Sequence, residues 1–277
     1  MVIGIIGLGN MGQMLVKGLC RSRAVSPGDI VVFNRSREKA ADLQQSFPVQ
    51  LADSAQETVD RADMLFICTK PLDVLPVLRE LTLPSRLHLV SVAAGVSVQD
   101  LETIHSGPVS KVIPTVTSEE LRGVSLLVNS SRVSERQRKS LQLLLGALGT
   151  VEEVTEESVE TATILTSSAP GLIAGILEAF AQAAVRTSPE LGIDTARRML
   201  VETLAGTSRL LENQQMGFDQ MMEKVATKGG ITEEGLAVLG RALPQAFDEL
   251  FSMTGEKHAL LKQKVQKQIN DNKGDLT

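Results

Sequence analysis

The sequence contains no tryptophan and no tyrosine, and phenylalanine, its one aromatic residue type, occupies 7 of 277 positions. Proteins that bind single-stranded nucleic acid usually stack bases on aromatic side chains, so this composition argues against that function. The net charge of -5 also argues against nucleic acid as a main partner. We therefore expect a soluble protein that does not bind nucleic acid.

Cysteine is also rare, and no pattern of metal ligands is present. Cys20 and Cys68 lie inside apolar stretches without the spacing of a metal site. They are most simply buried thiols in a reducing compartment. No basic segment followed by an apolar one marks a signal peptide. We therefore expect a cytoplasmic protein without a metal.

Long hydrophobic runs are absent as well. The longest uncharged stretch, Thr161–Leu177, is interrupted by Ser167, Ser168 and Pro170. It is shorter than a typical membrane-spanning helix, so we expect a buried helix and no membrane insertion.

The N-terminus carries the most informative motif. Val2–Ile6 reads as a buried parallel strand, and residues after the motif have helical spacing. Between them lies a G-x-G-x-x-G turn, which in dinucleotide-binding proteins lets the backbone approach a pyrophosphate at a helix N-terminus. The expected cofactor contacts in this turn are Gly7, Leu8, Gly9, Asn10, Met11 and Gly12.

The second predicted strand, Asp29–Phe33, ends where such a fold reads the adenosine ribose. An NAD-preferring site usually has an acidic residue here, but this chain has Asn34, Arg35 and Ser36. A guanidinium can pair with a 2′-phosphate, whereas a carboxylate would repel it. We therefore predict NADP(H) as the cofactor, with NAD(H) as the alternative.

Further predicted strands end at the same expected crevice. Ala62–Cys68 is followed by Thr69, Lys70 and Pro71, where a cation could face a cofactor phosphate. Leu87–Val92 leads into Ala93, Ala94 and Gly95, whose small size permits close approach of a ligand. The remaining strands are predicted at Lys111–Pro114, Val124–Val128 and Thr150–Val154.

After residue 155 the pattern contains only helices. We expect an α/β Rossmann domain over residues 1–155 and an all-α domain over residues 156–277. The apolar run Val159–Arg186 has hydrophobic residues on every face and needs cover from all sides. A second copy of the chain can supply it, so we predict a homodimer and leave a higher oligomer open. Further helices are predicted at Thr195–Glu212, Phe218–Lys224 and Thr232–Phe251, with a fraying extension over Lys257–Lys273.

The chain resembles the pyrroline-5-carboxylate reductases over nearly its whole length. The turn at Gly7–Gly12 and Asn34–Ser36 match, as do Lys70-Pro71, Ala93–Ser97 and Ser168-x-Pro170. The most specific match is Lys228–Leu239, where the family has Ser-Pro-Gly-Gly-Thr/Ala-Thr, two residues and Gly-Leu. The resemblance implies a Rossmann domain followed by a helical dimerisation domain. It also implies NADPH-dependent reduction of a cyclic imino acid, 1-pyrroline-5-carboxylate, to L-proline.

The resemblance also assigns residues to the site. Thr232 falls on a substrate-contacting threonine, which makes it the candidate catalytic residue, and Pro114 falls among cofactor contacts. A glycine turn before a capped helix is suited to a small carboxylate, although an ordinary capped helix fits the pattern alone equally well. The implied substrate contacts are Ser168, Thr227, Lys228, Gly229, Gly230, Ile231 and Thr232.

Three segments differ from the family pattern, and they leave other functions open. Family residues Met-Pro-Asn-Thr-Pro, Gly-Ser-Gly-Pro-Ala-Tyr and Ser-Pro-Gly-Gly are replaced at Ile113–Thr117, Ser167–Leu172 and Thr227–Gly230. A non-catalytic NADP(H)-binding regulatory paralogue, like those encoded in some bacterial competence operons, therefore stays possible. A β-hydroxyacid dehydrogenase is the other alternative. It would use a lysine as base, and Val159–Arg186 contains none.

Imine reduction demands little of the side chains. A protonated C=N bond is already electrophilic, so positioning supplies most of the catalysis. We accordingly interpret the three histidines, His88, His105 and His258, as structural.

Overall fold

The computed structural model describes residues 1–274, with side chains through residue 267. It divides into two compact units. The first contains Met1–Ser168 and the described residues from Thr254 onward, and the second contains Ala169–Met253. This division differs from the boundary expected near residue 155, because Val159 packs in the core of the first unit and the end of the chain returns to that unit. The fully buried Val265 belongs to that unit's core.

The first unit is built on one sheet of eight strands in the order β3-β2-β1-β4-β5-β6-β7-β8. All neighbouring pairs are parallel except β6 and β7. The predicted α/β class is confirmed, and the added β3 is a two-residue exposed edge strand that lacks an apolar signal. The strands are β1 Ile3–Ile6, β2 Ile30–Phe33, β3 Gln50–Leu51, β4 Met64–Ile67, β5 His88–Ser91, β6 Val109–Ile113, β7 Gly123–Asn129 and β8 Gly149–Glu153.

Strand β1 lies at the point where the winding of the sheet changes direction. It pairs with β2 on one side and β4 on the other, so Ile6 aligns with both Phe33 and Ile67. All residues of β1, β4 and β5 are buried, as the continuous apolar runs predict. Ligands of open α/β sheets bind beyond the carboxyl ends of the strands at such a point, which is where the turn after β1 begins.

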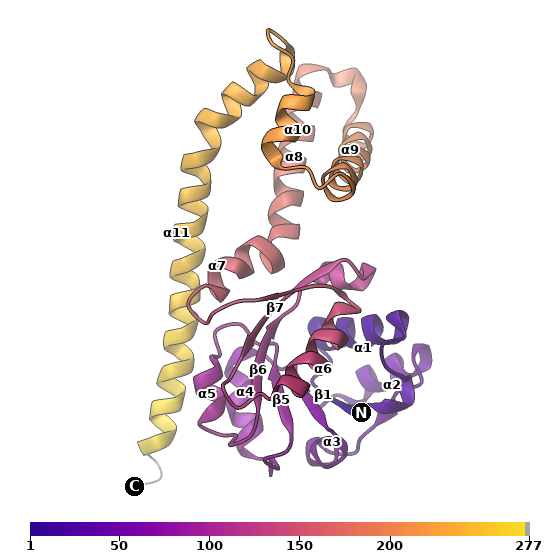
Figure 1. Cartoon of the computed structure of the whole chain (residues 1–277), viewed down its shortest axis with the longest axis vertical. Coiled ribbons are helices and arrows are strands. Elements are labelled where there is room, and N and C mark those ends of the chain that lie inside the picture. Colours follow the sequence, from indigo (N-terminus) through magenta and orange to yellow (C-terminus); the bar gives the residue numbers. More distant parts are fainter. Residues whose placement is uncertain (275–277) are drawn as a thin grey trace. The chain divides into compact units, whose positions relative to one another are not determined.

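Helices cover both faces of the sheet (Figure 1). One face packs against α1 (Asn10–Ser22), α2 (Arg37–Ser46) and α6 (Glu135–Gly146). The opposite face packs against α3 (Ala55–Arg61), α4 (Pro71–Arg79) and α5 (Val98–Glu102). The same face also buries Val159 of α7 (Val159–Thr163) and Val265 of the last helix. Short 3₁₀ turns are η1 (Pro27–Asp29) and η2 (Val116–Glu120).

The second unit is helical, as predicted. The helix that starts with α7 passes through a π-helical turn, η3 (Ile164–Ser168), and continues as α8 (Ala169–Thr187). Pro170 is the second residue of α8, and because it lacks an N–H it cannot donate to the backbone of this turn. The other elements are η4 (Pro189–Leu191), α9 (Ile193–Asn213), α10 (Phe218–Val225) and the first part of α11 (Ile231–Gly274).

Little of this second unit is buried within one chain. Ala181 and Ala196 are the buried residues among the described positions of α8, α9 and α10. Contrary to the sequence expectation, Val159–Thr187 is long and apolar enough to cross a membrane by length and composition. Only 11% of its most apolar window is buried in the chain. A helix that a second copy covers passes the same test, so this single observation is weak evidence for a membrane.

Candidate active site

The glycines of the N-terminal turn each meet a different constraint. Gly7 has a φ of +98°, and its N–H donates to the Phe33 carbonyl oxygen at 2.9 Å. A Cβ on Gly12 would lie 2.0 Å from the Gly7 carbonyl oxygen, so any side chain there would force the turn open. Gly9 differs, because no heavy atom lies within 4 Å of its Cβ position. The space in front of Gly9 is therefore open for a ligand.

The start of α1 is suited to an anion. Gly9 occupies the N-cap position without a side-chain hydrogen bond, and the first turn contains no acidic residue. Free backbone N–H groups and the positive end of the helix dipole thus remain available. A pyrophosphate would satisfy both.

The three residues predicted to read the ribose follow β2, and they differ in the contacts that they make. Asn34 accepts a hydrogen bond from the Leu8 N–H through Oδ1 and donates to the Ser36 carbonyl oxygen, both at 2.9 Å. Its amide therefore ties the two cofactor loops together. Arg35 is exposed and forms no salt bridge within the described residues, whereas the nearby Arg37 is paired with Asp53. Arg35 is thus available to pair with a phosphate.

Thr69 supplies an unpaired polar group beside this turn. Its hydroxyl oxygen is buried and has no hydrogen-bond partner among the described residues. The backbone nitrogen of Thr69 lies 3.2 Å from the Cβ position of Gly7. Burial raises the pKa of the adjacent Cys68 thiol to about 12, so Cys68 packs as a neutral residue. Lys70 is exposed at the N-cap of α4, ahead of Pro71. A buried hydroxyl without a partner, next to a glycine turn with open space at Gly9, suits a polar cofactor.

The loop after β5 corrects one expectation. Gly95, with a φ of +78°, does not leave its Cβ position open for a ligand, because the Leu261 Cγ from α11 lies 2.8 Å from that point. Ala93 and Gly95 are buried and Ala94 is half-buried. Any cofactor contact here must therefore come through the backbone or Ala94. Pro114 is buried just after β6.

Sequence reasoning missed an internal ion pair behind this loop. Lys111, 1% exposed in the centre of β6, donates to Glu156 Oε1 at 3.0 Å. Glu156 also accepts the Val98 N–H at 3.3 Å, at the start of α5. The signal was a lysine within an apolar strand and an acidic residue in the following Glu152–Glu157 cluster. Burial of a lysine requires such a partner.

Two histidines are also internal to the first unit. His88 Nε2 lies 2.8 Å from Ser110 Oγ, and His105 Nε2 lies 2.8 Å from the Leu87 carbonyl oxygen. Burial lowers the pKa of His88 to about 4 and lowers that of His105. Both rings are therefore neutral near pH 7 and poor candidates for proton donors. This agrees with their structural interpretation.

The glycine loop before α11 belongs to the second unit. The helix begins at Ile231, so Thr232 lies inside its first turn and is not the N-cap that the pattern suggests. Gly229, with a φ of +75°, donates to Glu233 Oε2 at 2.6 Å. Gly230 donates to the Thr227 carbonyl oxygen at 2.8 Å.

Two of the N–H groups expected to be free are therefore occupied within the chain. Thr232 is half-buried, whereas Thr227, Lys228 and Ile231 are exposed. Ser168 is exposed at the end of the π-helical turn and belongs to the first unit, and its role as a substrate contact stays a prediction.

Comparison with known proteins assigns these features to a family. Residues 2–95 match the model described as NADP oxidoreductase, coenzyme F420-dependent, and residues 156–261 match that of pyrroline-5-carboxylate reductase dimerisation. The chain is 36% identical to pyrroline-5-carboxylate reductase 3 of Bacillus subtilis, over 96% of this chain and 98% of the relative. It is 30% identical to ComE operon protein 4 of the same organism, over 98% and 100%.

Two solved structures share the fold. A 1-pyrroline-5-carboxylate reductase from Streptococcus pyogenes matches with a TM-score of 0.82 and 24% identity, over 95% of this chain and 98% of that one. The Plasmodium falciparum enzyme with NADP bound matches with a TM-score of 0.78 and 18% identity, over 96% and 97%. Taken with the full-length relatives, these findings show that the chain belongs to the pyrroline-5-carboxylate reductase family and is an NADP(H)-binding oxidoreductase.

Proposed function

We propose that this protein uses NADPH to reduce 1-pyrroline-5-carboxylate to L-proline in the cytoplasm. The observation that carries the proposal is its 36% identity to a pyrroline-5-carboxylate reductase across almost the full length of both chains. The bound cofactor would supply a hydride to the imine carbon. The protein's own residues bind and orient the two reactants.

The first unit would hold the cofactor. The backbone of Gly7–Gly12 and the uncapped start of α1 suit the pyrophosphate, and the unpaired Arg35 suits a 2′-phosphate. The orphaned Thr69 hydroxyl would gain a partner from the same ligand. These features fit NADP(H) better than NAD(H), because no carboxylate stands at the ribose end of β2.

The second unit would hold the substrate carboxylate. The Thr232 hydroxyl and backbone N–H groups at the start of α11 are donors of the required type. Lys228, which stands where the family has proline, adds a positive charge to the loop. No protein acid is required if the substrate imine is already protonated, which agrees with two buried, neutral histidines.

The deciding experiment follows NADPH oxidation with pyrroline-5-carboxylate and measures NADPH binding separately. Turnover with L-proline as product supports the proposal. Tight NADPH binding without reduction of any cyclic imine would favour the regulatory alternative. The altered Thr227–Gly230 segment supports that alternative.

A variant of Thr232 tests the substrate site directly. Thr232→Ala should lower kcat/KM for pyrroline-5-carboxylate by on the order of tenfold to a hundredfold, because one aligned hydrogen bond is lost. NADPH affinity should stay unchanged. Since α11 begins at Ile231, the substitution removes no N-cap, and stability should change little. Thr232→Ser, which keeps the hydroxyl, is the matched control. Full activity in a folded Thr232→Ala variant would place the carboxylate site elsewhere.

A further inference from the structure

The second half of α11 does not behave as the fraying extension that its lysine-rich sequence suggests. From Thr254 onward it is part of the first unit, and Val265 is completely buried there. Lys262 Nζ forms an ion pair with Glu160 Oε1 of α7 at 2.9 Å. These contacts attach the helix to one face of the first unit.

The most specific contact of this helix is with the loop between β5 and α5. The Leu261 side chain fills the space beside Gly95, with Cγ 2.8 Å and Cδ2 3.0 Å from the Cβ position of that glycine. The positive φ of Gly95 adds a second reason for glycine. The loop and the helix thus constrain each other sterically.

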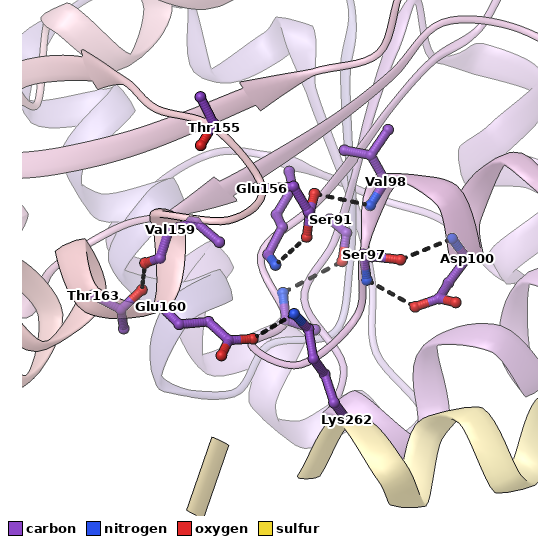
Figure 2. A network of polar contacts seen from close by, with 12 residues as sticks. Ser91, Ser97, Val98, Asp100, Thr155, Glu156, Val159, Glu160, Thr163 and Lys262 are labelled. Carbon is purple, nitrogen blue, oxygen red and sulfur yellow. Dashed lines mark hydrogen bonds and ion pairs between the residues drawn. The ribbon is translucent and has the colours of Figure 1, made fainter. Parts of the chain in front are cut away.

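Polar contacts join the same two segments. Gln266 of α11 donates to Asp100 Oδ1. Asp100 Oδ2 accepts the Ser97 N–H at 2.9 Å, and Ser97 Oγ accepts the Asp100 N–H at 3.0 Å, which forms the capping box of α5 (Figure 2). The helix therefore contacts the residue that fixes the end of the Ala93–Ser97 loop.

The loop is supported on its other side by the ion pair described above. Glu156, held by the buried Lys111, accepts the N–H of Val98, the residue after the loop. Figure 2 shows the hydrogen bond between Val98 and Glu156 and the ion pair between Lys262 and Glu160 in the same network of polar contacts. The loop is thus held by the buried ion pair of Lys111 and Glu156, and Leu261 of α11 packs against it.

We propose that Leu261 and Gln266 of α11 are positioning residues for the cofactor, because they keep the Ala93–Ser97 loop in its NADP(H)-binding conformation. The inference rests on the proposed function only in taking that loop as a cofactor contact. A cofactor that binds the ordered loop must in turn stabilise the helix that orders it, since coupling between two sites is reciprocal. A purely structural role of the helix would not produce this coupling.

The first test compares neighbouring leucines by titration with NADPH alone. Leu261→Ala should weaken NADPH binding by on the order of fivefold to tenfold. Leu260→Ala is the matched control, because Leu260 is 53% exposed on the same turn, and it should bind as the unmutated protein does. Leu261→Met should restore most of the affinity. At saturating NADPH, the KM for the imine should be unchanged in all three variants.

The second test needs no variant. Amide hydrogen exchange in residues 254–267 of the unmutated protein should slow when NADPH is added, and exchange in η1 (Pro27–Asp29) should not. A folded Leu261→Ala protein with unchanged NADPH affinity would overturn the proposal, and so would unchanged exchange in residues 254–267. If Leu261→Ala does not fold, the exchange experiment decides. Both readouts use cofactor binding, so they stay informative if the protein reduces no imine.

Discussion

The two units of this chain differ in how much of their apolar surface each buries within a single chain. In the first, the central strands are fully buried and helices cover both faces of the sheet. In the second, large apolar side chains stay exposed on helices whose apolar composition is typical of buried helices. These include Ile173, Ile176, Phe180, Met199, Val201 and Leu204. The first unit therefore has its own core, whereas the second needs another surface.

The family match identifies that surface as a second copy of the chain. Residues 156–261 match a dimerisation domain, and they include the whole second unit. Soluble monomers seldom expose a contiguous apolar patch of this extent. We therefore propose an obligate dimer, whose interface would bury about 2,000 Å² or more.

The largest expected effect follows from a charge placed on the exposed face of α8. Ile176 is 50% exposed in the single chain, and Ile176→Asp should abolish dimer formation and imine reduction, because an aspartate in an apolar interface is costly to desolvate. Sedimentation and turnover measure both. NADPH should still bind to the first unit.

Leu143→Asp is the matched control for this substitution. Leu143 is 77% exposed on α6 of the first unit, outside the matched dimerisation region. The same change there should leave the dimer and its activity intact. A dimeric, active Ile176→Asp protein would contradict the comparison between the units.

Within the first unit, two glycines should separate cofactor binding from stability. Gly12→Ala should lower the free energy of unfolding and weaken NADPH binding by on the order of a hundredfold, because its Cβ would lie 2.0 Å from the Gly7 carbonyl oxygen. Gly9→Ala should weaken NADPH binding without loss of stability, since no atom lies within 4 Å of its Cβ position. Thermal unfolding and NADPH titration of both variants distinguish these outcomes. Unchanged NADPH affinity in Gly9→Ala would show that the cofactor does not occupy the space before Gly9.

The strands of the first unit were not equally predictable from the sequence, and the reason is physical. A buried parallel strand leaves a continuous apolar run, so β1 and β4 were predictable within a few residues, whereas the exposed two-residue β3 was not. The turn after β1 was predictable because local geometry requires two of its glycines, Gly7 and Gly12. Leu261 over Gly95 was not, because two residues so distant in sequence leave no periodic signal.

The substrate loop shows the same limit. Its glycines predicted the turn, and Gly229 indeed has a positive φ. The helix start was predicted one residue late, because threonine is a good N-cap residue and nothing in the local sequence excludes that role. The hydrogen bond from Gly229 to Glu233 depends on side-chain conformation, which no spacing rule specifies.

Cofactor preference should depend on one residue of the first unit. Arg35→Ala should weaken NADPH binding by roughly 1–3 kcal/mol, as expected for loss of a charged hydrogen-bond partner, and barely change NADH binding. Arg37→Ala is the control, because Arg37 is already paired with Asp53 and should contribute less. Titration with both cofactors measures the difference. Equal affinity of the unmutated protein for NADPH and NADH would contradict the assignment of Arg35.

The smallest expected effect is a difference between the two units in how their stability depends on pH. Burial lowers the pKa of His88 from its ordinary 6.5 to about 4, so between these values the unfolded chain binds more protons than the folded one. The contribution of neutral His88 to the stability of the first unit is therefore fully present above pH 6.5 and should fall by about 2 kcal/mol by pH 5. His105 shifts the same way and adds to the slope.

The second unit should respond only at lower pH. Its Glu178 carboxylate accepts hydrogen bonds from Arg197, which lowers the pKa of Glu178 to about 2. That contribution is present above the ordinary carboxyl pKa of 4.5 and is lost below it, as the pH falls toward 2.

Denaturant unfolding at pH 7, 6 and 5 should therefore show a loss of stability for the first unit. His88→Gln should flatten that slope, and it keeps a hydrogen-bonding group opposite Ser110. An equal slope in His88→Gln and the unmutated protein would mean that His88 does not titrate on unfolding.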